Sequence, residues 1–137
     1  MITTEELNER KLLEQFEDGT LNPILFTHEI QLRISWIYIH KYVVEKAISM
    51  FCDYKEQYYK NVLKNTKFNL PLSKAYVEIL HFFMERSSVT NFEKLLREFP
   101  RLKFNFKKLV KTHYGYNILK EHRTEEPQTV RPILFTF

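Results

Sequence analysis

The 137-residue sequence contains only two glycines and one cysteine, and it has no apolar run long enough to cross a membrane. Loops that hold phosphates or dinucleotides need several closely spaced glycines, so the Walker and G-x-G-x-x-G classes of site are excluded. The single Cys52 excludes an intramolecular disulfide framework and cysteine-rich zinc modules, and it is typical of a reducing compartment. We expect Cys52 to be a small buried apolar side chain.

The N-terminus is polar and acidic, unlike a signal peptide, which begins basic and then becomes apolar. We therefore expect a cytoplasmic protein with no membrane partner. The chain is 44% hydrophobic and 15% aromatic, which predicts one globular domain over residues 1–137. Its net charge of +4 is unevenly placed, because residues 97–123 carry eight Lys or Arg against two Glu.

Helical periodicity dominates the chain, with proline and glycine falling between the periodic stretches. The pattern predicts an all-α bundle of five or six helices in a single domain. The expected helices cover residues 3–18, 28–40, 44–65, 71–87, 90–99 and 102–114. Residues 1–22 form the first helix and a turn, and residues 123–137 form a non-helical tail that packs back on the bundle as a strap. Thr90 with Glu93 is a capping-box pattern that predicts where the fifth helix begins.

The second of these helices is ambiguous, because Ile30, Leu32, Ile34 and Trp36 alternate with polar residues as in a strand. Two observations favour a helix. At residues 37–39 the alternation ends, because consecutive positions are all apolar or aromatic. Glu29 and Arg33 also form a favourable i,i+4 pair. In the third helix, Phe51 and Tyr58 belong to an apolar stripe, and we expect Lys55 to lie on the solvated side.

His28 is the first candidate for chemistry, because it stands at a predicted helix N-terminus, where the macrodipole keeps imidazole neutral. A neutral imidazole can act as a metal ligand or as a general base. Glu29 can share a site with His28 only at the helix end. The alternative is structural: Glu29 pairs with Arg33, while His28 packs against an aromatic ring or caps a neighbouring backbone.

Glu78 and His81 have the E-x-x-H spacing, which places a carboxylate and an imidazole on one helix face. This spacing recurs twice in carboxylate-bridged di-iron bundles, but it occurs once here. With His28 it suggests a site for a divalent metal made of His28, Glu78 and His81. The alternative is that Glu78 and His81 are solvated or hydrogen-bonded to each other.

The basic segment 101–123 interleaves lysine and arginine with aromatic residues, a composition compatible with nucleic-acid binding. Its periodicity favours another interpretation, in which the aromatic residues belong to the core and the lysines form the solvated face of one amphipathic helix. Nucleic acid is therefore a disfavoured partner.

Residues 26–39 have the sequence FTHEIQLRISWIYI. This segment resembles the opening motif of a widespread uncharacterised family of small bacterial all-α proteins, which begin with a helix similar to FTHEAHLRLAW. The resemblance extends over most of residues 25–137 and implies a helix at residues 28–40. Two histidines of the family pattern are replaced, by Gln31 in the first motif and by Val77 in a later Y-H-E-T motif. If those histidines act in metal binding or acid–base chemistry, this chain retains only part of the set.

The leading hypothesis is a binding protein for a small molecule or peptide, with a pocket near the start of the second helix. The expected pocket residues are His28, Glu29, Arg33, Trp36, Tyr76 and Glu78. A second hypothesis is a metal-assisted or acid–base enzyme that uses His28 with Glu78 or His81. A third is a homo-oligomeric module for protein interaction.

Overall fold

The computed structural model describes residues 4–114, and this part of the chain is helical without any strand. Its elements are α1 (Thr4–Asp18), η1 (Pro23–Leu25), α2 (His28–Lys41), α3 (Val44–Tyr58), the π-helical turn η2 (Tyr59–Leu63), α4 (Leu70–Met84), α5 (Phe92–Glu98), α6 (Arg101–Phe104) and α7 (Phe106–Tyr114). The all-α prediction is confirmed. The strap expected at residues 123–137 lies outside the described residues. None of the helices within residues 4–114 combines the length and apolar character needed to span a membrane.

Short polar side chains and one glycine set the helix ends. Thr27 caps α2 by accepting a hydrogen bond from the backbone N–H of Ile30, and Asn69 caps α4 in the same way. α1 ends at Gly19, whose φ of +80° lies in the left-handed region that favours glycine. The capping residue of α5 is Asn91, which accepts from Lys94, so the capping box predicted at Thr90 is wrong by one position.

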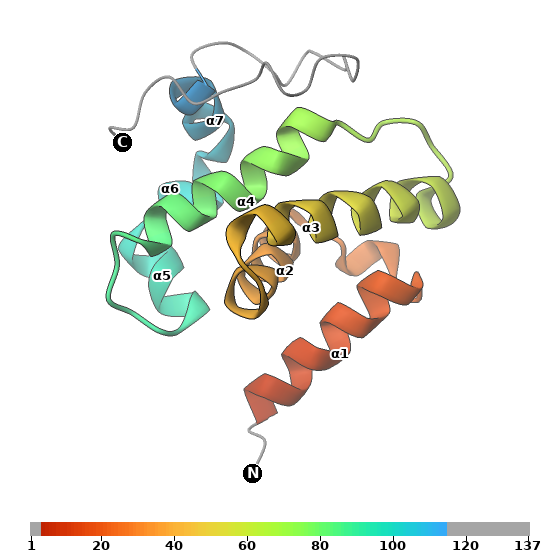
Figure 1. Ribbon diagram of the computed structural model, residues 1–137, viewed down its shortest axis with the longest axis horizontal. Coiled ribbons are helices and arrows are strands. Elements are labelled where there is room, and N and C mark those ends of the chain that lie inside the picture. Colours follow the sequence, from red (N-terminus) through yellow and green to blue (C-terminus); the bar gives the residue numbers. More distant parts are fainter. Residues whose placement is uncertain (1–3, 115–137) are drawn as a thin grey trace.

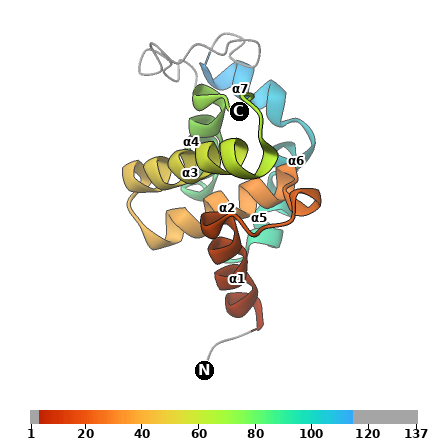
Figure 2. The ribbon, with the colours of Figure 1, turned by 90° about the vertical axis from the view of Figure 1, so that its right-hand side faces the viewer.

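The centre of the bundle is α4, which packs against both α2 and α3 (Figure 1). α1 packs on α2 and α3, whereas α7 packs on α4. In both views α1 and α7 lie at opposite ends of the molecule (Figures 1 and 2). The arrangement leaves α2 in the interior, with different neighbours on each side.

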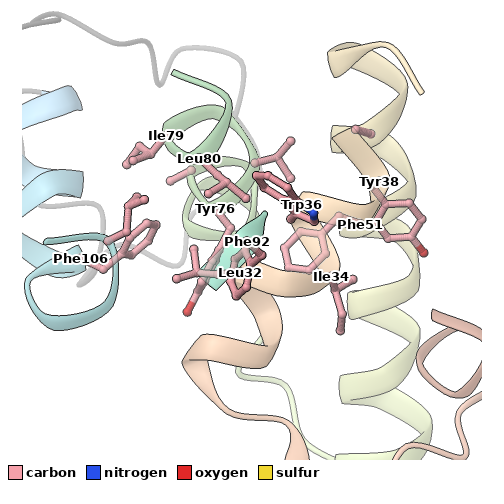
Figure 3. Close-up of a cluster of buried hydrophobic side chains, with 14 of the residues drawn as sticks. Leu32, Ile34, Trp36, Tyr38, Phe51, Tyr76, Ile79, Leu80, Phe92 and Phe106 are labelled. Atoms are coloured by element: carbon pink, nitrogen blue, oxygen red, sulfur yellow. The ribbon is translucent and has the colours of Figure 1, made fainter. Parts of the chain in front are cut away.

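The helical prediction for residues 28–40 is confirmed, and the burial of α2 explains its strand-like alternation. Leu32, Ile34 and Tyr38 are all fully buried, although they do not share a single helix face. A helix that is covered nearly all round needs apolar residues on every side, and this masks its 3.6-residue period. Figure 3 shows these side chains with Trp36 and Phe92 in the shared core.

The predicted sixth helix is split into α6 and α7 at Asn105, which has φ −136° and ψ 36° and so leaves the helical region. The break turns Phe106 into the core, where its ring stacks on that of Tyr76 with centroids 4.8 Å apart. Phe104, just before the break, remains 72% exposed. A single continuous helix over residues 102–114 is therefore wrong.

Candidate functional site

His28 occupies the first position of α2, and both of its ring nitrogens form hydrogen bonds within the protein. Nε2 lies 2.9 Å from the carbonyl oxygen of Leu102, which can only accept, so Nε2 carries the proton and donates. In the neutral ring Nδ1 then accepts from the Tyr76 hydroxyl at 2.8 Å. His28 thus joins the start of α2 to α4 and α6.

Burial lowers the pKa of His28, and the positive charge of Lys55 acts in the same direction. The hydrogen bond to Leu102 and the charge of Glu29 oppose the shift without cancelling it. The neutral imidazole expected from the sequence agrees with this direction. Its cause is mainly desolvation.

A cavity of about 820 Å³ opens beside His28 and Tyr76, between α4 and the α6–α7 segment. Its volume lies within the range of small-ligand pockets. Leu72, Phe104 and Phe106 supply apolar and aromatic walls. Its remaining lining is polar or basic, and comprises Asn105, Lys103, Lys107, Lys108 and Lys111.

The charges around this cavity are unbalanced. Lys103 pairs with Glu29, with Nζ and Oε1 3.0 Å apart. Within residues 4–114 no carboxylate pairs with Lys107, Lys108 or Lys111. The described residues therefore give the cavity an excess of positive charge beside an aromatic wall. The lysines do lie on the solvated side of α7, as the sequence predicted, and their side chains also border this cavity.

Arg33 lies in a different place from His28. It borders a second groove, of about 660 Å³, together with residues of α1 and α5. Its guanidinium forms an ion pair with Glu93, another with Glu9 at 3.6 Å, and covers the Phe92 ring with Cζ 4.8 Å from the centroid. The predicted pair between Glu29 and Arg33 is replaced by these contacts and by the pair between Glu29 and Lys103. Arg33 and His28 are five residues apart, about 140° around the helix, which explains the separation.

Trp36 and Glu78 are also placed away from the His28 cavity. Trp36 is a core residue, 6% exposed, with its ring 5.8 Å from Phe92. Glu78 follows Tyr76 by two positions in α4, about 200° around the helix, so the two side chains point in opposite directions. Of the six expected pocket residues, only His28 and Tyr76 line the cavity, with Glu29 at its edge through Lys103.

The expected metal ligands His28, Glu78 and His81 are not brought together. His81 Nδ1 lies 3.6 Å from Oε1 of Glu85, the residue that follows the end of α4. Among residues 4–114 there is no group of three or more His, Cys, Asp or Glu side chains that could hold a metal ion. The single E-x-x-H spacing therefore forms no ligand set within the described structure.

Lys55 is buried, and the prediction that it lies on the solvated side of α3 is wrong. It is 3% exposed, and its Nζ lies within 4.6 to 5.8 Å of the ring centroids of Tyr76, Phe51 and Tyr59. Burial lowers its pKa to about 7, a shift that only the neighbouring Cys52 opposes. Cys52 is buried as expected, and burial raises the pKa of its thiol to about 12.

The spacing of Lys55 from its apolar neighbours in the sequence indicates that it is buried. It follows Phe51 by four residues and precedes Tyr58 by three, so it stands in the middle of the apolar stripe of α3. A lysine in that place is usually assigned to the edge of a helix face, where its ammonium reaches water. Here the rings of α4 and η2 close over it.

A scan of protein-family models, a search of curated proteins and a search of solved structures each return no match to this chain.

Proposed function

We propose that this protein is a binding protein whose ligand is a small molecule, or the end of a peptide, that carries an acidic group. The ligand occupies the cavity beside His28 and Tyr76. The observation that supports the proposal is the excess of lysine around an aromatic-walled cavity, with no carboxylate paired to three of those lysines within residues 4–114. A ligand anion supplies the missing negative charge.

The cavity offers two kinds of contact. The ammonium groups of Lys107, Lys108 and Lys111 can each donate hydrogen bonds to carboxylate, phosphate or sulfonate oxygens. The exposed ring of Phe104 and the buried ring of Phe106 provide apolar surface for a flat ligand body. Together they favour a ligand with one acidic group attached to an apolar or aromatic part.

His28 has a supporting role in this proposal. Both its nitrogens are used within the protein, so it holds Tyr76 and the α6 backbone in place beside the cavity. The same hydrogen bonds weaken the enzyme hypothesis, because a general base needs a free nitrogen within reach of its substrate. Glu78 and His81, its expected partners, line no part of this cavity.

The proposal is tested with 2-naphthalenesulfonate, an aromatic anion that stays ionised over the whole working pH range. Isothermal titration should show saturable binding to one site per chain, and neutral 2-naphthalenemethanol should bind much more weakly. The double variant Lys107→Gln with Lys111→Gln should lose about tenfold in affinity, since exposed charge contacts contribute up to about 1 kcal/mol each.

The matched control is Lys11→Gln with Lys41→Gln, which removes the same charge from exposed positions on α1 and α2. Lys11 lies on α1, and Lys41 borders a pocket lined mainly by α1 residues. Figure 1 shows α1 and α7 at opposite ends of the molecule. An equal loss of affinity in both double variants means that net charge alone attracts the probe. That result, or equal binding of the neutral alcohol, contradicts the proposed site.

A further inference from the structure

Lys55 lies directly behind the wall of the cavity. The Phe106 ring stacks on one face of Tyr76, at 4.8 Å and an interplanar angle of 23°. The Nζ of Lys55 lies 4.6 Å from the centroid of the same Tyr76 ring. Among the described residues Lys55 has cation–π contacts with Phe51, Tyr59 and Tyr76 but none with Phe106, so the ammonium lies over the face of Tyr76 that Phe106 leaves open. One aromatic ring therefore separates the ammonium from the cavity lined by Tyr76 and Phe106.

Among residues 4–114, the groups that contact Lys55 carry no negative charge. Phe51 and Cys52 come from its own helix, Tyr59 from η2 and Tyr76 from α4. From α2, His28 is close enough for its pKa to feel the charge of Lys55. Within residues 4–114 no carboxylate forms an ion pair with Lys55.

An ammonium in such a place is costly, because burial removes its water and no carboxylate within residues 4–114 takes the place of that water. The rings give partial compensation through their negative faces. The residue nevertheless titrates near neutral pH, with a pKa of about 7, so the protonated and neutral forms are of similar free energy. A small change in local charge is then enough to shift its protonation.

We infer that Lys55 is a proton-accepting residue coupled to the cavity: an anion that enters beside His28 and Tyr76 is bound together with a proton that Lys55 takes up. This inference rests on the proposed function. It deepens that function by making the site a proton-linked anion site. Lys55 acts across the Tyr76 ring on the charge of the ligand and is a positioning residue that does not touch the ligand.

The sign of the pH dependence follows from linkage. A bound anion stabilises the protonated lysine and raises the pKa of Lys55 above its value of about 7 in the free protein. Affinity is then highest below pH 7 and falls as the pH rises through 7 to the raised value. The fall is about tenfold for each unit by which the anion raises the pKa. The pKa of His28 is lowered from 6.5, so protonation of His28 changes the affinity only at more acidic pH, as a separate step.

The experiment combines titrations of the full chain with 2-naphthalenesulfonate at pH 6 to 9 with a pH-stat measurement in unbuffered solution at pH 7.5. The wild-type protein should take up a fraction of a proton per probe bound, and its affinity should fall by about tenfold between pH 6.5 and 9. Lys55→Met should take up no proton at pH 7.5. It should also bind with the same affinity from pH 7.5 to 9, close to that of wild type at pH 9.

Lys55→Arg is the matched variant, because arginine keeps its charge at every working pH. If it folds, it should bind without proton uptake and with an affinity that does not fall above pH 7. A second readout is the ¹³Cε resonance of Lys55, whose titration midpoint should move upward when the probe is present.

Binding of the probe to wild type with no proton uptake, or an unmoved Lys55 midpoint, overturns the inference while the proposed function stands. Proton uptake that persists in Lys55→Met also overturns it, by assigning the proton to another group. Absence of probe binding at every pH refutes the proposed function, and the proton-linked site with it.

Discussion

The positively charged side chains on the two sides of α2 differ in whether carboxylates pair with them. On one side the guanidinium of Arg33 has two carboxylates, from Glu93 and Glu9, and lies over the ring of Phe92. On the other side, beyond His28, Lys55 is buried among aromatic rings, and three lysines of α7 line part of a cavity. The first side is electrostatically complete within the protein. On the second side, residues 4–114 supply no carboxylate that pairs with Lys55 or with the lysines of α7, and this is why we propose that a ligand anion binds there.

The largest expected effect is that of Lys55→Met on stability. A lysine whose pKa falls from 10.5 in the unfolded chain to about 7 in the folded protein costs about 4 kcal/mol of stability at pH 7. The folded state binds fewer protons than the unfolded state between those values, so the penalty is full below pH 7 and disappears as the pH rises to about 10.5. Methionine has a similar volume and no charge, so Lys55→Met should raise the free energy of unfolding at pH 7 by about 4 kcal/mol.

Urea unfolding of both proteins at pH 6, 8 and 10 measures this difference. The gain should be largest at pH 6 and smallest at pH 10. Lys46→Met is the control, since Lys46 is an exposed lysine of the same helix, and its effect should stay within about 0.5 kcal/mol at every pH. A gain of equal size at all three pH values would show that Met packs better than Lys, without any contribution from a buried charge.

The next effect concerns the hydrogen bonds of His28. His28→Ala leaves the Tyr76 hydroxyl and the Leu102 carbonyl without their partner and opens space between α2 and α4. Together these losses should cost about 3 kcal/mol. Tyr76→Phe removes only one of the two hydrogen bonds and should cost about 1 kcal/mol.

The pH dependence of the stability difference between wild type and His28→Ala distinguishes the hydrogen bonds of the neutral imidazole from the packing of its ring. The pKa of His28 is lowered in the folded protein, so its contribution is present above the ordinary value of 6.5 and is lost as the pH falls through the lowered value. The difference between wild type and His28→Ala should therefore be constant above pH 6.5 and smaller in acid. A difference that grows in acid would mean that the protonated ring is the form that holds α2 to its neighbours.

The helices were predictable because their period, caps and breakers are local properties of the chain. Even α2, with its strand-like alternation, could be assigned from the continuation of the apolar run at residues 37–39. The break at Asn105 was not predictable in this way, because its cause is tertiary. Phe106 reaches the ring of Tyr76 only after the chain turns there.

The candidate site was half predictable for a similar reason. His28 and Tyr76 meet as expected, since each begins or borders an apolar face that must be covered. Arg33 was expected there from its i,i+4 spacing to Glu29, and Glu78 from the E-x-x-H spacing and the family resemblance. Rotation by 100° per residue nevertheless turns Arg33 away from His28 and Glu78 away from Tyr76. The burial of Lys55 was not predicted, because a charged side chain favours solvent even where its position lies within the apolar stripe of α3.

The smallest expected effect on stability concerns the side of α2 on which Arg33 pairs with carboxylates. Burial alone would raise the pKa of Glu93, but the hydrogen bond from Arg33, a backbone hydrogen bond and the charges of Arg33 and Arg97 together outweigh it, so the pKa of Glu93 is lowered. Its ion pair with Arg33 therefore contributes stability above the ordinary carboxyl pKa, and this is lost as the pH falls through the lowered value. Because the Glu93 side chain is 46% exposed, Glu93→Gln should cost only about 0.5 to 1 kcal/mol.

Thermal unfolding in dilute buffer and in 1 M NaCl checks this, because salt screens exposed pairs and should remove most of the difference. The counterpart on the other side is Lys108→Gln, which breaks no ion pair within residues 4–114. That variant should be neutral or slightly stabilising in dilute buffer, since it relieves repulsion from Lys107 and Lys111. If Lys108→Gln costs as much as Glu93→Gln, the lysines are already paired inside the folded protein, and the contrast between the two sides of α2 is lost.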